Sequence, residues 1–201
     1  MQDLTPAELV RRQDDLQAEA ADIEADLQLV SLLSRAGEPF RVGSAAYGLM
    51  VLRDLDVTVV CTKLALQPIT DIGARLAEHP RVWRVEFRND TGQWNTAARY
   101  PDGLYLGVGY RSPAGNAWKL DIWFVDEPAR QPDLAHLSSI PSQLTPPTRE
   151  AILRIKTTWA SRPEYGKTVR SFDIYTAVLN DGVRTGDEFE EWLARRTQPG
   201  Q

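Results

Sequence analysis

Residues 42–60 read VGSAAYGLMVLRDLDVTVV and place a Gly-Ser pair shortly ahead of an Asp-x-Asp pair. The apolar residues around the aspartates predict a strand over 55–61, preceded by a short strand at 39–42 and a short helix at 45–52. Because side chains alternate along a strand, Asp54 and Asp56 project to one side while Leu55 and Val57 enter the core. Two carboxylates on one side of a strand can bracket one cation.

A third aspartate, Asp121, lies within the apolar run KLDIWFV at 119–125. A carboxylate in such a strand is costly unless it is paired or bound to a metal. Magnesium prefers hard oxygen ligands and completes its octahedron with water and phosphate oxygens. Gly43 lets the backbone approach closely, so that Ser44 and the neighbouring N–H groups can hold phosphates at the mouth of the helix. The other interpretation is that Asp54 ends a turn and Asp121 is a charge on an edge strand.

The remaining pattern predicts a small mixed sheet flanked by helices, an α/β (α+β) fold. Proline density rises after Pro128 and indicates a connector into a helical C-terminal third. We therefore divide the chain into an N-terminal helix over 1–37, a sheet domain over 38–130 and a C-terminal helical domain over 131–201. The predicted helices cover 5–36, 68–78, 147–160, 168–181 and a segment from 185, and an antiparallel meander covers 82–88, 104–110 and 118–125.

Composition excludes several classes of protein. The chain of 201 residues is 42% hydrophobic and 25% charged, values typical of a globular domain with one sizeable core. No apolar run approaches the roughly 20 residues that a membrane span needs. The N-terminus lacks the basic start and apolar middle of a signal peptide. Cys61 stands alone in a Val-rich run and is expected to be a small buried hydrophobe, so we expect a reducing, cytoplasmic setting without a membrane partner.

The formal net charge of -5 is unevenly distributed. Residues 1–30 are strongly acidic, and the rest of the chain is close to neutral. Residues 149–170 are locally basic, which suits contact with a polyanion such as triphosphate, although a solvated basic helix face is the more ordinary interpretation.

The order of Gly-Ser, Asp-x-Asp and a later strand aspartate resembles the nucleotidyltransferase superfamily with the DNA polymerase β-like catalytic core. The matching residues are Gly43, Ser44, Asp54, Asp56 and Asp121, and the resemblance covers residues 38–126 with a helical region after it. One departure is that Arg53 precedes Asp54 where many members carry Ser or Thr. The motif identifies the superfamily well and the substrate poorly.

The resemblance implies transfer of a nucleoside monophosphate from an NTP, such as ATP, to an acceptor hydroxyl or phosphate, with release of pyrophosphate. Asp54 and Asp56 would bind two Mg²⁺ ions, for which Mn²⁺ can substitute, and Asp121 would ligate the catalytic metal nearest the acceptor. Lys167 and Arg170, expected on one helix face, are candidates for binding the triphosphate, and Tyr165 or Tyr175 for stacking on the base. Tyr175 also keeps register with Phe172 and Leu179, which favours a core position.

Three functions stay open at this point. The near-neutral body favours a small-molecule acceptor, because enzymes that act on nucleic acids usually have a broader basic surface. The second is modification of RNA or of a protein, as in toxin–antitoxin systems, with the basic segment 149–170 at the acceptor. The third is a catalytically idle member that serves as a binding module through its acidic first helix. No residue selects one NTP, and a homodimer is one assembly compatible with the sequence.

Overall fold

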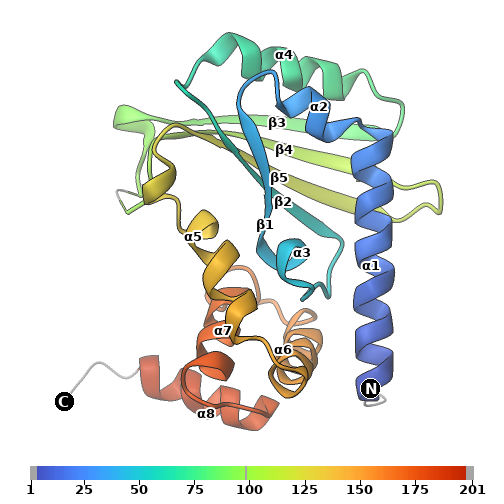
Figure 1. The fold of residues 1–201 in the computed structure, drawn as a ribbon, viewed down its shortest axis with the longest axis vertical. Helices are drawn as coiled ribbons and strands as arrows, with labels where there is room; N and C mark the ends of the chain where they lie inside the picture. Colours follow the sequence, from blue (N-terminus) through green and yellow to red (C-terminus); the bar gives the residue numbers. More distant parts are fainter. Residues whose placement is uncertain (1–3, 98, 198–201) are drawn as a thin grey trace.

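The computed structural model describes residues 4–97 and 99–197 and contains one mixed sheet with helices on its faces and at one end (Figure 1). The sequence-based fold class is confirmed. The strands are β1 (Glu38–Val42), β2 (Asp54–Val60), β3 (Val82–Asp90), β4 (Gly103–Arg111) and β5 (Ala117–Val125). The α-helices are α1 (Pro6–Asp26), α2 (Leu29–Leu33), α3 (Gly43–Tyr47), α4 (Leu66–Ala77), α5 (Pro132–Ser139), α6 (Pro146–Trp159), α7 (Ser171–Leu179) and α8 (Gly186–Thr197).

The strand order across the sheet is β1-β2-β5-β4-β3. The predicted meander is confirmed, since β3, β4 and β5 pair antiparallel in sequence. The strand-helix-strand order β1-α3-β2 is also confirmed, with β1 antiparallel to β2. The predicted bounds of its helix, 45–52, are wrong, because α3 covers Gly43–Tyr47 and ends at Gly48, which adopts a left-handed conformation with φ of +68°. Only β2 and β5, among the described strands, pair in parallel, and their register sets Asp56 opposite Asp121. The pairing of these two strands therefore brings distant aspartates together.

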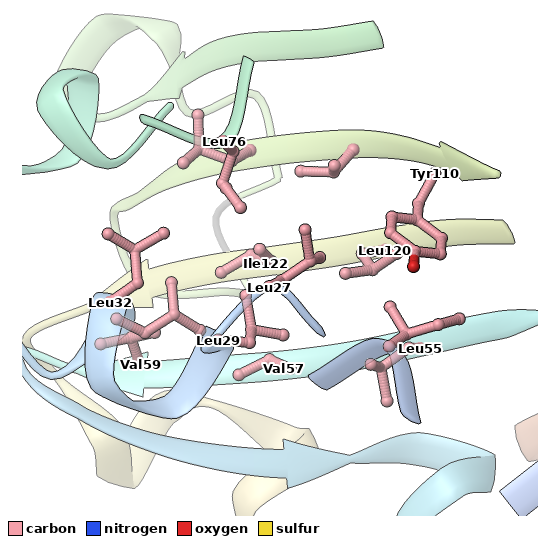
Figure 2. Close-up of a cluster of buried hydrophobic side chains, with 14 of the residues drawn as sticks. Leu27, Leu29, Leu32, Leu55, Val57, Val59, Leu76, Tyr110, Leu120 and Ile122 are labelled. Atoms are coloured by element: carbon pink, nitrogen blue, oxygen red, sulfur yellow. The ribbon is translucent and has the colours of Figure 1, made fainter. Parts of the chain in front are cut away.

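One face of the sheet carries the larger apolar core. Leu55, Val57 and Val59 of β2 and Leu120 and Ile122 of β5 are buried there, as the alternation of the sequence predicts. Helices α2 and α4 cover this face, and Figure 2 shows Leu27, Leu29, Leu32 and Leu76 directed toward the strands. This packing leaves the alternate side chains of β2 and β5, including the aspartates, on the opposite face.

The C-terminal helices form a second buried cluster. It is centred on α6, α7 and α8 and includes Leu49 and Val51 from the segment between α3 and β2. Leu9 of α1 also packs here, so the first helix contributes to both clusters. The division of the chain at residues 37 and 130 remains a prediction.

The predicted single helix over 5–36 is wrong beyond Asp26. It begins as expected with a capping box, in which Glu8 and Thr5 bond reciprocally. It ends at Asp26, and Gln28 adopts a left-handed conformation with φ of 48° before α2 starts. The turn rotates the chain so that Leu29 is buried while Val30 is 59% exposed. Tertiary packing against the sheet thus overrides the helical periodicity.

Two other expectations for the C-terminal region need correction. The predicted connector contains helix α5, which begins with Pro132 at its first position, where proline is well tolerated because that N–H has no intrahelical acceptor. Conversely, the helix predicted from 168 begins only at Ser171. Gly166 has a φ of +80°, and a bridge between Tyr165 and Val169 closes a loop instead.

In the part of the chain that the structure describes, none of the helices combines the length and apolar character needed to cross a membrane.

Candidate active site

Three aspartates converge at the floor of a cleft. Asp54 and Asp56 extend from β2 and Asp121 from β5, and one carboxylate oxygen of each lies within 4.8 Å of the other two. The parallel register explains the convergence, because Asp56 faces Asp121 directly and Asp54 faces Lys119. The structure thus brings together the three carboxylates that the sequence suggested.

Burial makes this cluster expensive without a cation. Burial, followed by the charge of Asp121, raises the pKa of Asp54 to about 6. Burial, and then the charges of Asp54 and Asp121, raises the pKa of Asp56 well above its ordinary value. Among the described residues, Asp54 Oδ1 is buried without a hydrogen-bond donor. The three carboxylates offer only oxygen ligands, and one of these oxygens has no hydrogen-bond donor. Such a group of ligands fits a hard divalent cation such as Mg²⁺.

Asp121 is oriented by two donors that the sequence analysis did not select. Lys119 Nζ donates to Asp121 Oδ2 at 2.6 Å, and the Tyr105 hydroxyl donates to Oδ1. The Lys119-x-Asp121 spacing places both side chains on the same side of β5 and was a usable signal. Tyr105 lies on β4, 16 residues before Asp121 in the sequence, so no local pattern indicates that the two side chains meet.

Gly43 meets Asp56 across the start of α3. Its φ is +64°, and a Cβ atom at this position would lie 2.4 Å from Asp56 Oδ2. Only glycine therefore permits this backbone path beside the carboxylate. Ser44 follows in the first turn of α3 and lines the same cleft. The Gly-Ser pair and the Asp-x-Asp pair are thus direct neighbours.

The cleft has a volume of about 1090 Å³ and extends from the aspartates to the loop before α7. Lys167 and Arg170 line it, as does Tyr165. The prediction that the two cations share a helix face is wrong, because both precede α7 in a loop. Arg170 instead donates its backbone N–H to Asp173 at 2.8 Å. All seven site residues of the sequence analysis nevertheless border one cavity: Gly43, Ser44, Asp54, Asp56, Asp121, Lys167 and Arg170.

The aromatic residues of the cleft differ in accessibility. Tyr175 is buried, in agreement with its expected core position, and Tyr165 bonds Ser171 at 2.7 Å. Phe172, which the sequence analysis assigned only to a buried helix face, is 49% exposed. It stacks on His136 of α5 with ring centroids 4.6 Å apart. Because α5 was missed, nothing in the sequence paired these two rings.

Lys156 is a further charged residue near the aspartates. It is fully buried in α6, and Nζ donates to the Leu49 carbonyl at 2.7 Å and to the Tyr175 hydroxyl at 3.0 Å. Burial lowers its pKa to about 7, although the charges of Asp56 and Asp54 oppose that change. In the sequence, Lys156 falls on the apolar helix face that contains Ile152 and Ile155, and this pattern could have predicted a buried lysine.

Comparisons with known proteins show the fold. No protein-family model matches the sequence, and no curated protein matches it. Among solved structures, Cid1 in complex with its short product ApU has a TM-score of 0.57 and 18% identity over 83% of this chain and 48% of its own. A cytoplasmic RNA terminal U-transferase has a TM-score of 0.56 and 17% identity over 86% of this chain and 54% of its own.

The crystal structure of the Cid1 poly(U) polymerase is similar at a TM-score of 0.54, with 16% identity over 88% of this chain and 55% of its own. The chain thus spans about half the length of the structures it resembles. Together these likenesses show that the chain shares the overall fold of these three structures.

Proposed function

We propose that this protein is a magnesium-dependent nucleotidyltransferase that transfers a nucleoside monophosphate from an NTP to an acceptor hydroxyl or phosphate. The acceptor oxygen attacks the α-phosphorus, the bond from that phosphorus to the bridging oxygen of the β-phosphate breaks, and pyrophosphate leaves. The acceptor gives up its proton during the attack. The observation that carries the proposal is the set of three aspartates within 4.8 Å of one another at the floor of a large cleft.

The three aspartates would have different roles. Asp54 and Asp56 would bind both metal ions, and Asp121 would complete the set on the acceptor side. Bound Mg²⁺ would neutralise phosphate charge and lower the pKa of the acceptor hydroxyl, and Mn²⁺ has similar ligand preferences. Lys119 and Tyr105 hold the Asp121 carboxylate in one orientation through its two oxygens. With the carboxylate held in this way, an acceptor bound beside it would keep a fixed position relative to Asp121.

The remaining cleft residues suit the other parts of an NTP. Ser44 beside Gly43 suits the β- and γ-phosphates, and Lys167 and Arg170 supply positive charge across the cleft. The exposed face of Phe172, supported from behind by His136, suits stacking of the base. We therefore replace the stacking roles of Tyr165 and Tyr175 with Phe172. None of these contacts selects one base, so ATP is one of four candidate donors.

Two acceptor classes are compatible with this reaction. The near-neutral body suits a small molecule, as the sequence analysis proposed. The similar structures include an RNA terminal U-transferase and a poly(U) polymerase, which makes RNA the second class. A catalytically idle binding module would retain the fold and lose joint binding of metal and nucleotide.

Calorimetric titration of each NTP in the presence of Mg²⁺ tests the proposal. Wild-type protein is expected to bind at least one NTP only when Mg²⁺ is present. A double variant, Asp54→Asn with Asp56→Asn, keeps the side-chain size and is expected to lose this binding. Asp71→Asn on the exposed face of α4 is the matched control and should bind as the wild type does. Equal binding by the double variant would refute the metal site.

A further inference from the structure

The face of the sheet that carries the aspartates continues beyond Asp121 onto β4 and β3. Leu104, Leu106 and Val108 of β4 are buried in the core, so the alternate residues Gly107 and Gly109 face the other side. The register sets Gly107 opposite Asp121 and Gly109 opposite Lys119. This side of β4 therefore presents two positions without side chains directly beside the proposed catalytic carboxylate.

Trp83 of β3 fills the space over one of these glycines. A register irregularity between Val82 and Arg84 directs its ring onto β4. A Cβ atom on Gly109 would lie only 2.6 to 2.9 Å from three atoms of the indole. The ring thus rests against the glycine backbone and is still 60% exposed. A large aromatic ring held against the sheet and open to solvent is a ready surface for stacking.

The glycine under this ring lies close to the proposed reacting centre. Gly109 and Asp121 are diagonal neighbours on adjacent strands, a relation that separates residues by about 7–8 Å. The stacking surface therefore lies next to Asp121, and neither Trp83 nor Gly109 is among the residues that line the cleft with Phe172 and Lys167. A molecule bound there would approach the α-phosphate from the acceptor side.

Three cations lie on the same face of the sheet as the Trp83 ring, namely Arg84, Arg111 and Lys119. Arg84 pairs with Glu86, and Lys119 pairs with Asp121, yet the side chains of these two cations are 58% and 63% exposed. The exposed Arg84–Glu86 pair is worth at most about 1 kcal/mol, so a phosphate can compete for Arg84. Lys119 keeps its bond to Asp121 and has further N–H donors on its ammonium group for a phosphate. Arg111, which shares the face of Gly109 by alternation, donates to the Gly115 carbonyl at 3.1 Å and is also exposed. Cations around an exposed aromatic ring are the arrangement that binds single-stranded nucleic acid.

We infer that this surface, defined by Trp83, Arg84, Gly109, Arg111 and Lys119, binds the end of a single-stranded RNA as the acceptor, with an unpaired base stacked on Trp83. The inference rests on the proposed function and selects RNA from its two acceptor classes. The charge of the surface is local, which explains why the near-neutral composition of the chain did not reveal it.

The test measures RNA binding alone, without NTP or divalent cations. A short single-stranded RNA with a fluorescent label at its 5′ end is titrated with protein, and the anisotropy is recorded at several salt concentrations. Stacking of one base is worth about 1–3 kcal/mol, so Trp83→Ala is expected to weaken binding about 5- to 150-fold. Trp83→Phe keeps a ring and should recover most of the affinity. Binding by the wild type should also weaken as salt increases.

Trp94→Ala is the matched control, because Trp94 is 62% exposed and lies outside this surface. It should bind RNA as the wild type does, and thermal melts should show that all variants are folded. Equal RNA affinity of wild type and Trp83→Ala, an equal loss in Trp94→Ala, or no RNA binding by the wild type would each overturn the inference. Titration of NTP with Mg²⁺ into Trp83→Ala separates the two proposals. If this variant loses RNA binding and still binds NTP, the loss is due to the Trp83 surface and not to the nucleotide site.

Discussion

At the residue scale, Asp54 is the group whose protonation most directly reports on the site. Its pKa is raised from 3.8 to about 6 by burial first and by Asp121 second. The folded protein therefore binds this proton more tightly than the unfolded chain does. The associated stability is fully present below about pH 4 and is lost as the pH rises through about 6, a total of about 3 kcal/mol.

Asp54→Asn is expected to remove the contribution of Asp54 to the pH dependence, while the raised pKa of Asp56 leaves a contribution of the same sign. In metal-free protein, the variant should match the wild type near pH 4 and be up to about 3 kcal/mol more stable at neutral pH. Chemical denaturation with a chelator present, at a series of pH values, measures the difference. Asp71→Asn, an exposed substitution on α4, should stay within about 0.5 kcal/mol of the wild type throughout. If the wild type is more stable than Asp54→Asn at neutral pH, burial of the ionised Asp54 carboxylate does not cost the stability assigned to it.

Gly43 is the second residue on which the site depends. Gly43→Ala would strain a backbone with φ of +64° and place Cβ 2.4 Å from Asp56 Oδ2. We expect a stability loss greater than the roughly 1–2 kcal/mol of the strained backbone alone, together with loss of Mg²⁺-dependent NTP binding. Thermal unfolding and calorimetric titration measure these two effects separately.

Gly92→Ala isolates the contribution of the backbone. Gly92 has a similar φ of +54°, and no atom lies within 4 Å of the added Cβ position. The control should lose only the cost of the strained backbone, about 1–2 kcal/mol, and keep its nucleotide binding. If both variants bind nucleotide normally, the close approach of Gly43 to Asp56 does not matter for the site.

At the scale of secondary-structure elements, the break between α1 and α2 shows where sequence patterns reach their limit. The capping box at Thr5 and the apolar spacing predict α1 correctly up to Asp26. The spacing then continues through Val30, although that residue is exposed in the structure. The turn at Gln28 is required by packing of Leu29 on the sheet, and a local pattern carries no information about the position of that sheet.

Gln28→Gly is expected to stabilise the protein. A non-glycine residue at φ of 48° costs about 1–2 kcal/mol, and glycine relieves most of it while adding some chain entropy to the unfolded state. The net gain should approach about 1 kcal/mol in chemical denaturation. Ala18→Gly, at an exposed position inside α1, should instead cost about 1 kcal/mol. Destabilisation by both substitutions would show that Gln28 is not strained.

Elements also decide which site residues the sequence could reveal. Asp54, Asp56 and Asp121 were predictable because each interrupts an apolar strand, where a carboxylate requires an explanation. Tyr105 and Trp83 were not, because their roles depend on how β4 pairs with its neighbours. The stack of Phe172 on His136 depends on α5, whose proline was interpreted as part of a connector. Pairing between elements, not residue type, was the missing information.

At the scale of the whole molecule, the cleft lies between the sheet and the C-terminal helices. The floor comes from β2 and β5, and Lys167, Arg170 and Phe172 come from the loop before α7 and its first turn. Lys156 links the two sides, since it donates from α6 to the Leu49 carbonyl ahead of β2. A ligand with a triphosphate and a base would contact both sides at once.

An NTP labelled on either its α- or its γ-phosphate tests nucleotidyl transfer at the three aspartates. With Mg²⁺ and single-stranded RNA, we expect the α-label to join the acceptor and the γ-label to appear only in pyrophosphate, in equal amounts. Asp121→Asn should abolish both products, and Asp71→Asn should leave them unchanged. Transfer of γ-label to the acceptor, or equal product from Asp121→Asn and the wild type, would contradict nucleotidyl transfer at the three aspartates.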